Sequence, residues 1–228
     1  MNTQNGFLLS FIKYGENDAV LHCFTEEDGF QSYFLKGIYS RKNKKKAFLQ
    51  PLNKLNFSIS PVRGNGISTI SKFELVKGHD AYTDIKASTV IFFVADFLNQ
   101  VLRLENKNPN IFYSIERFID ELEQQNYQCH LLFLLVILKV QGVAPLIGEG
   151  NFLDPETGTF SSVSAHQLFN EEISIIWKNI ITAENLYSVK IHPSLRKDFL
   201  DSLLVYYHYH ITDFKNPTSL EVIQQIFE

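Results

Sequence analysis

Residues 29–73 read GFQSYFLKGIYSRKNKKKAFLQPLNKLNFSISPVRGNGISTISKF. Apolar and polar side chains alternate in three runs that begin within this stretch: 30–36 (FQSYFLK), 54–60 (KLNFSIS) and 67–74 (ISTISKFE), the last of which ends one residue beyond it. A period of two is typical of half-buried β-strands. A loop rich in Gly, Ser, Asn and Lys (37–46) follows the first run, and Arg63-Gly64-Asn65-Gly66 predicts a hairpin turn between the other two.

The same stretch carries a strong charge asymmetry. It holds nine basic residues and no Asp or Glu, in a chain of net charge −4. Such segregation concentrates positive potential on one region and attracts polyanions. A run of lysines is most often only a solvated loop, but this one lies between strands that contain aromatic residues, which favours nucleic acid. The predicted DNA-binding residues are Lys36, Arg41, Lys42, Lys44, Lys45, Lys46, Lys54, Arg63 and Lys72.

Two more strands are predicted before this stretch, at 7–12 (FLLSFI) and 19–25 (AVLHCFT), each followed by turn residues. Five short strands in about 75 residues indicate a small barrel or sandwich. The five-stranded OB-fold is a common barrel of this size and binds oligonucleotides. We therefore predict an OB-fold domain over residues 1–80.

The pattern becomes helical after about residue 83, which predicts a helical domain over 81–228 and an α+β fold class. Asp84 is suited to cap the first helix, and Ser164 with Gln167 has the spacing of a capping box. A segment without helical or strand periodicity at about 143–163 is predicted to be a loop. The expected helices cover 84–104, 110–125, 127–141, 164–181, 193–214 and 219–227.

Bulk composition indicates a globular protein of a reducing compartment. The chain has 228 residues, 45% of them apolar, and only two cysteines, Cys23 and Cys129, which argues against a disulfide framework. The N-terminus does not resemble a signal peptide. The longest apolar run, 131–138, is far shorter than the roughly 20 residues of a membrane span. We expect a soluble cytoplasmic protein with no membrane partner.

The familiar catalytic motifs are missing from the sequence. It contains no Walker A, GxGxxG or GxSxG motif. His208 and His210 are two residues apart, so on a helix they point to different sides and do not share a metal ion. Asp154 and Glu156 flank a proline and are interpreted as a turn. No cofactor, metal site or catalytic residue is expected, and an enzyme on this scaffold is the least favoured of three interpretations.

Aromatic side chains of the second and third strands are candidates for base stacking. They are Phe24, Phe30, Tyr33 and Phe34. Strand aromatics are more often core residues. Tyr33 is selected as the exposed one because it is amphipathic and close to the lysine run.

Several short motifs, in this order, make the chain similar to the RecO family of recombination mediators. Lys13-Tyr14-Gly15-Glu16 and Phe34-x-Lys36-Gly37 come first, and Leu49-Gln50-Pro51-Leu52 follows the basic run. Gly142-x-x-Pro145-x-Ile147 and Tyr207-x-x-x-Ile211 continue the resemblance into the helical half. Each motif is weak, but together they span nearly the whole chain.

The resemblance implies a DNA repair function without enzymatic activity. RecO proteins bind single- and double-stranded DNA, anneal complementary strands without ATP, and help to load RecA onto strands coated by single-stranded-DNA-binding protein, with RecR as partner. A cytoplasmic, nucleoid-associated location follows. The family's four-cysteine zinc site would fall after Pro145, but residues 144–165 contain no cysteine, so no zinc is expected.

Two functions remain open at this point. One is the DNA-binding mediator, whose basic residues neutralise phosphates. The other is an adaptor whose basic barrel binds an acidic protein segment without acting on DNA. The resemblance also implies binding of the acidic tail of single-stranded-DNA-binding protein in the helical half, where the candidates by residue type are Arg196, Lys197 and Lys215.

Overall fold

The computed structural model describes residues 2–60, 66–78 and 84–227. The chain forms two compact units. The first comprises residues 1–112 with 217–219, and the second comprises 113–216 with 220–228.

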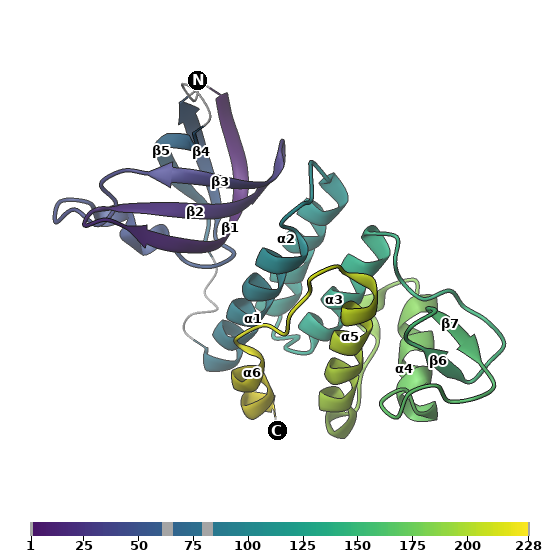
Figure 1. Cartoon of the computed structure of the whole chain (residues 1–228). Coiled ribbons are helices and arrows are strands. Elements are labelled where there is room, and N and C mark those ends of the chain that lie inside the picture. The colour runs from purple at the N-terminus through teal and green to yellow at the C-terminus, as the bar shows by residue number, and fades with distance from the viewer. Residues whose placement is uncertain (1, 61–65, 79–83, 228) are drawn as a thin grey trace. The chain divides into compact units, whose positions relative to one another are not determined.

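Five strands of the first unit close into a barrel (Figure 1). They are β1 (Asn2–Tyr14), β2 (Asp18–Thr25), β3 (Gly29–Leu35), β4 (Lys54–Ser60) and β5 (Ser68–Lys77). Their order is β1-β2-β3-β5-β4, and β4 pairs with β1 to close the ring. The pairs are antiparallel except for β3 with β5, which is parallel. The predicted five-stranded OB-fold is confirmed; the turn predicted at Arg63–Gly66 lies largely outside the described residues.

Alternation of side chains along the strands produces the barrel core. Leu21, Leu35 and Phe57 are among the inward residues, and each is at most 5% exposed. β1 has 13 residues and pairs with both β2 and β4, and its register with β2 shifts between Leu8 and Ser10. Such an irregularity bends a strand and helps a small sheet to close.

Helix α1 (Ile85–Val101) also belongs to the first unit. Asp84 caps it, as predicted, by accepting a hydrogen bond from the Lys86 backbone N–H at 2.9 Å. The Ser10 hydroxyl of β1 donates to Asn99 at 2.9 Å. After the helix, the Glu105 carbonyl accepts a hydrogen bond from the Phe30 N–H at 2.9 Å. Two hydrogen bonds, one in the last turn of α1 and one just after the helix, therefore tie the barrel to this end of α1.

The second unit is built from α2 (Pro109–Glu123), whose first turn belongs to the first unit, and from α3 (Cys129–Val140), α4 (Glu171–Thr182), α5 (Arg196–His210) and α6 (Leu220–Phe227). Its largest core side chain, Trp177, is fully buried and donates its indole N–H to the Ser202 hydroxyl at 3.0 Å. The Tyr207 hydroxyl donates to the Leu134 carbonyl at 2.7 Å. These bonds connect α4 to α5 and α5 to α3. None of the described helices has the length and apolar character to cross a membrane.

Two predicted helix boundaries are wrong. The helix expected at 164–181 begins only at Glu171, because Asn170 is the actual cap and its side chain accepts a hydrogen bond from the Ile173 N–H at 3.0 Å. The capping box at Ser164 does not form, although its spacing is correct. The helix expected at 193–214 begins as a 3-10 turn, Pro193–Leu195, and its α-helical part ends at His210.

The segment predicted as a loop at 143–163 contains a short hairpin, β6 (Phe152–Asp154) paired with β7 (Thr159–Ser161). The Ser174 hydroxyl of α4 accepts a hydrogen bond from the Leu153 N–H at 3.0 Å. His210 Nε2 lies 2.8 Å from the Pro155 carbonyl. The hairpin is thus held by α4 and α5, and the helical domain is not purely α-helical.

Candidate nucleic-acid interface

The lysine run is ordered by its neighbours. Gly37 takes a positive φ of 67° after β3, and its N–H donates to the Asp18 carboxylate at 2.8 Å. The Tyr39 N–H donates to the Asn17 carbonyl at 2.9 Å. A 3-10 helix, Lys44–Phe48, then begins at Asn43, whose side chain accepts a hydrogen bond from the Lys45 N–H at 2.9 Å. The start of the segment 37–48 is therefore fixed against the β1–β2 turn, and the 3-10 helix that follows is capped within the segment.

Lys45 has a structural role that the sequence did not indicate. It is half-buried, and its ammonium group donates to the Phe73 carbonyl at 2.6 Å while lying 5.3 Å from the centre of the Phe73 ring. Removing the whole lysine run is therefore not neutral for folding, because this side chain anchors the 3-10 helix to β5.

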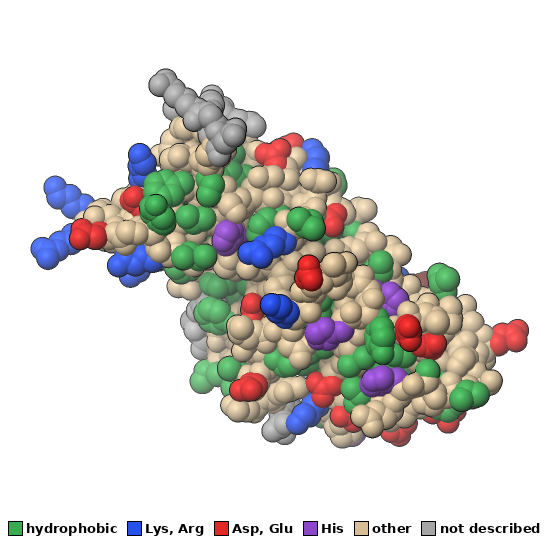
Figure 2. Space-filling model, viewed as in Figure 1, with side chains coloured by type: hydrophobic (Ala, Val, Ile, Leu, Met, Phe, Trp, Pro, Cys, Tyr) green, Lys and Arg blue, Asp and Glu red, His purple; other side chains and the backbone are tan. Residues whose placement is uncertain are grey.

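Five of the predicted basic residues are exposed on or beside this segment: Lys36, Arg41, Lys42, Lys44 and Lys46. We call these five the basic loop. Figure 2 shows Lys and Arg side chains projecting at the left of the view, from the end of the barrel where this connection lies. Exposed cations gathered on one ordered segment can neutralise successive phosphates.

Tyr39 lies on the same segment as the basic loop and was not selected from the sequence. It is half-buried, and two ammonium groups lie over its ring, that of Lys46 at 5.2 Å and that of Lys13 at 5.6 Å. Lys13 comes from the end of β1, outside the basic stretch, so only the folded chain brings it to this surface.

The other predicted basic residues lie elsewhere. Lys72 is exposed and forms an ion pair with Glu74 at 3.1 Å, which offsets its charge. Lys54 is half-buried on β4, with its ammonium group 5.2 Å from the centre of the Phe112 ring. Arg63 lies outside the described residues.

The prediction that Tyr33 is an exposed stacking residue is wrong. Its side chain is only 2% exposed, it packs against Phe57 with ring centres 4.9 Å apart, and its hydroxyl donates to Gln4 at 3.0 Å. Strand alternation points Tyr33 into the barrel together with Leu35. Phe24 is also fully buried. The half-buried aromatics of β3 are instead Phe30 and Phe34.

An open hollow of about 480 Å³ lies beside Phe30. His22 and Ser32 line it from β2 and β3, the segment before β5 contributes Ile67, and Arg103 contributes a cation from the turn after α1. His22 Nδ1 and the Ser32 hydroxyl are 2.8 Å apart, within hydrogen-bond distance. Partial burial, and secondarily the charge of Arg103, lower the pKa of His22. The hollow therefore combines an exposed guanidinium with a histidine ring whose neutral form is favoured.

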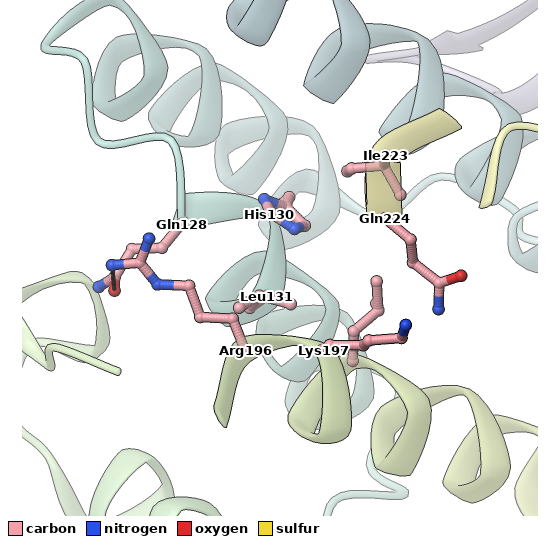
Figure 3. Close-up of a pocket in the computed structure, with 8 residues that line it drawn as sticks. Gln128, His130, Leu131, Arg196, Lys197, Ile223 and Gln224 are labelled. Atoms are coloured by element: carbon pink, nitrogen blue, oxygen red, sulfur yellow. Dashed lines mark hydrogen bonds between the residues drawn. The ribbon is translucent and has the colours of Figure 1, made fainter. Parts of the chain in front are cut away.

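A second candidate site is a pocket in the helical unit (Figure 3). Leu131 and Leu200 contribute apolar surface, and α6 adds Ile223. Two of the three cations predicted for tail binding, Arg196 and Lys197, line this pocket, whereas Lys215 is not among its lining residues.

Hydrogen bonds hold one cation of this pocket in place. The Arg196 Nε donates to the Ile191 carbonyl at 3.1 Å, and a guanidinium nitrogen lies 3.5 Å from Gln128 Oε1. Gln128 is itself buried and accepts a hydrogen bond from the Ile191 N–H at 3.1 Å. Lys197 is exposed, so its ammonium group is the more accessible of the two.

Within the described part of the chain, no group of three or more His, Cys, Asp or Glu could hold a metal ion. The two histidines considered for a metal make separate contacts: His208 Nε2 is 3.0 Å from Asn216 Oδ1, and His210 Nε2 contacts Pro155.

Comparison with known proteins relates the barrel and the first part of the helical region to one family. Residues 1–79 match the family model described as Recombination protein O N terminal, and residues 82–148 match Recombination protein O C terminal. The chain is 32% identical to the DNA repair protein RecO of Flavobacterium psychrophilum, over 96% of each chain. It is also 32% identical to the RecO of Christiangramia forsetii, over 96% of each, and 27% identical to that of Phocaeicola vulgatus, over 97% of each.

Proposed function

The chain belongs to the RecO family of DNA repair proteins, and from this premise we propose that it is a non-enzymatic, DNA-binding recombination mediator. It binds single and double strands, anneals complementary strands without ATP, and helps to load RecA onto strands coated by single-stranded-DNA-binding protein. RecR is its expected partner. The proposed DNA-binding residues are those of the basic loop together with Lys13 and Tyr39.

The observation that carries the proposal is the exposed cation cluster on an ordered segment of an OB-fold. Phosphate neutralisation releases condensed counterions, and this favours binding to DNA of any sequence. Two complementary strands on one positive surface repel each other less, so annealing needs no nucleotide hydrolysis. The sequence has no Walker A motif that would couple the reaction to ATP.

The test is DNA binding as a function of salt. We expect Arg41→Gln/Lys42→Gln/Lys44→Gln to lower the log–log salt slope on a single strand by about two units, since each phosphate contact contributes about 0.7. Binding should weaken equally on all sequences, and annealing should fall in parallel. Lys45 is kept in this variant because of its bond to Phe73.

A matched control removes three charges elsewhere: Lys86→Gln/Lys190→Gln/Lys215→Gln, all exposed on the helical part of the chain. It has the same net charge as the test variant and should keep the wild-type slope. If both triple variants bind and anneal alike, the basic loop is only a solvated surface and the proposed interface is wrong.

We further propose that the pocket of Figure 3 takes the acidic tail of single-stranded-DNA-binding protein. An apolar floor suits a hydrophobic side chain of the tail, and the cations at its edge suit carboxylates. Lys197→Gln should weaken binding of a tail peptide by up to about fivefold, the value of one exposed ion pair. Lys215→Gln is the matched control and should not change it. Equal effects of the two variants would refute this location.

The alternative function is a basic adaptor for acidic proteins without a role on DNA. A competition experiment between the tail peptide and an oligonucleotide distinguishes it from the mediator. In the mediator, the tail peptide and an oligonucleotide bind at the same time, because they use different surfaces. In the adaptor, the peptide occupies the basic loop. Displacement of DNA by the peptide, together with no annealing, would favour the adaptor.

A further inference from the structure

The pocket of the helical unit is nearly closed. In Figure 3, α5 lies on one side of it and α6 on the other, and the cavity between its lining residues measures only about 30 Å³. That is roughly the volume of one water molecule in the liquid, whereas the engineered apolar cavities that take up benzene measure roughly 150 Å³. A hydrophobic side chain of an acidic tail therefore does not fit while the pocket keeps this form, so one of its walls has to move.

Two walls of the pocket are part of the core. Helix α3 buries nine of its 12 residues, and α5 buries seven of its 15. The hydroxyl of Tyr207 on α5 donates to the Leu134 carbonyl of α3, and the indole of Trp177 on α4 donates to Ser202 of α5. Moving α3 or α5 would break this packing, so neither helix is free to open the pocket.

The third wall, α6, is held against the pocket by few contacts. It has eight residues, and Ile223 is the one buried side chain among the described side chains of 220–226. The Gln224 side chain donates to the Asp201 carboxylate of α5 at 2.9 Å. Isolated helices of fewer than about 12 residues are marginal in water. α6 therefore depends on these tertiary contacts for its place, and it separates from the pocket at a lower free-energy cost than α3 or α5.

The chain directly before α6 is fixed by a different group of contacts. The Asp96 carboxylate accepts hydrogen bonds from the Thr218 hydroxyl at 2.9 Å, and from the hydroxyl and the backbone N–H of Ser219 at 3.2 and 3.3 Å. None of these three bonds involves a residue that lines the pocket. A helix that is held at its beginning and only weakly along its face can turn away from the pocket and return.

We propose that α6 is a lid over this pocket, and that the acidic tail of single-stranded-DNA-binding protein binds only after the lid opens. The inference rests on the tail site proposed above and adds its regulation. In the closed form Ile223 lines the apolar floor together with Leu131 and Leu200. In the open form that floor takes the hydrophobic side chain of the tail, and Lys197 pairs with a carboxylate. The closed form lowers the apparent affinity in proportion to the fraction of molecules that are open.

Gln224→Ala tests the lid because it removes the side-chain bond that holds α6 to α5. This variant should bind a synthetic peptide of the acidic tail about fivefold more tightly than the wild type does, the effect of one hydrogen bond lost from the closed form alone. Gln225→Ala is the matched control, since it is the same substitution at the next position of the same helix, where the side chain is exposed. It changes the helix propensity equally and should leave the affinity unchanged.

Hydrogen exchange of the unmodified chain gives a second measurement. A saturating concentration of the tail peptide should speed amide exchange in α6, because the opened helix loses its tertiary contacts. Exchange in α3 should not rise at the same peptide concentration, which separates opening of the lid from general unfolding.

Two results overturn the lid and leave the tail site intact. The first is a Gln224→Ala variant that binds the tail no more tightly than Gln225→Ala does. The second is exchange in α6 that stays the same or slows when the peptide binds, as expected of a helix that closes onto the tail. If Lys197→Gln does not weaken tail binding, or the unmodified chain does not bind the peptide, the tail site and the lid are both wrong, whereas the proposed DNA binding by the basic loop is unaffected.

Discussion

His130 is a histidine that the fold keeps neutral. It lies in the first turn of α3, is 4% exposed, and its Nδ1 is 2.7 Å from the Tyr127 carbonyl. Burial lowers the pKa of His130 to about 4; the Tyr127 contact opposes this shift and the nearby Arg196 charge adds to it. The ring borders the pocket proposed for the acidic tail, so its protonation state affects the stability of that pocket.

We expect stability to fall with acid through this residue. Below about pH 6.5 the unfolded chain binds a proton at this histidine that the folded chain does not bind until about pH 4. The contribution of His130 to the free energy of unfolding is therefore highest above pH 6.5 and falls as the pH is lowered towards 4. The loss from His130 is about 3 kcal/mol over this interval. Urea unfolding at pH 7 and pH 4.5 should show a shallower pH dependence for His130→Gln than for wild type. His192→Gln, at an exposed position, should keep the wild-type dependence; identical behaviour of the two variants would contradict the assignment.

At the scale of elements, the β6–β7 hairpin shows how a segment without the family's four cysteines is held. Gly158 is buried in its turn with a positive φ of 66°, and a Cβ there would lie 2.7 Å from the Tyr206 hydroxyl. The Lys178 ammonium group of α4 donates to the Gly150 carbonyl at 3.1 Å and lies 5.0 Å from the centre of the Phe160 ring. Close packing on α4 and α5 positions this hairpin.

Substituting Gly158 tests this account. Gly158→Ala should destabilise the chain by more than the 1–2 kcal/mol, roughly, of placing a non-glycine residue in the left-handed region, because the methyl group also displaces Tyr206. Gly15→Ala is a matched control: its φ is 59°, and a Cβ there meets no atom within 4 Å. This control should lose only the stability that a non-glycine residue loses by adopting the left-handed backbone conformation. Equal shifts of the two denaturation midpoints would show that the hairpin is not tightly packed on α5.

At the scale of the whole molecule, the strands of the barrel pack against the chain that follows α1, so the barrel is not an isolated unit. Phe112, in the first turn of α2, is 1% exposed and lies 4.9 Å from Phe7 of β1, ring centre to ring centre. Gly29, at the start of β3, approaches the Asn106 backbone so closely that a Cβ would lie 2.3 Å from it. The first compact unit accordingly extends to residue 112, although the barrel strands end at Lys77.

We predict that Phe112→Ala destabilises the barrel as well as the helix that carries it. Truncating a buried phenylalanine costs about 3–5 kcal/mol. In hydrogen exchange of the full chain, protection should fall in β1 and β4 together with α2. Tyr113→Ala, at the neighbouring and 56% exposed position, should leave that protection unchanged. A loss confined to α2 would mean that the barrel is an independent unit ending near residue 80.

Local sequence patterns were sufficient to predict most of the secondary-structure elements and to identify the family. The strand predicted at 54–60 coincides with β4, and the Asp84 cap forms as expected, because alternation and capping depend only on nearby residues. The excess of basic residues at 29–73 is likewise a property of the chain itself. The order of short motifs indicated the RecO family, and the family comparison confirms it.

The tertiary structure alone decided which of these residues are available to a ligand. Barrel closure turns Tyr33 inward and leaves Phe30 and Phe34 outside. Alternation in the sequence shows that these residues face opposite sides of the strand, but it does not show which side faces the core. Lys45 is anchored to β5 by its hydrogen bond to the Phe73 carbonyl. Arg103 lines the same hollow as His22 of β2, although the two residues are 81 positions apart in the sequence. Such contacts join residues that are distant along the chain, so their free energies follow from packing and leave no local pattern to read.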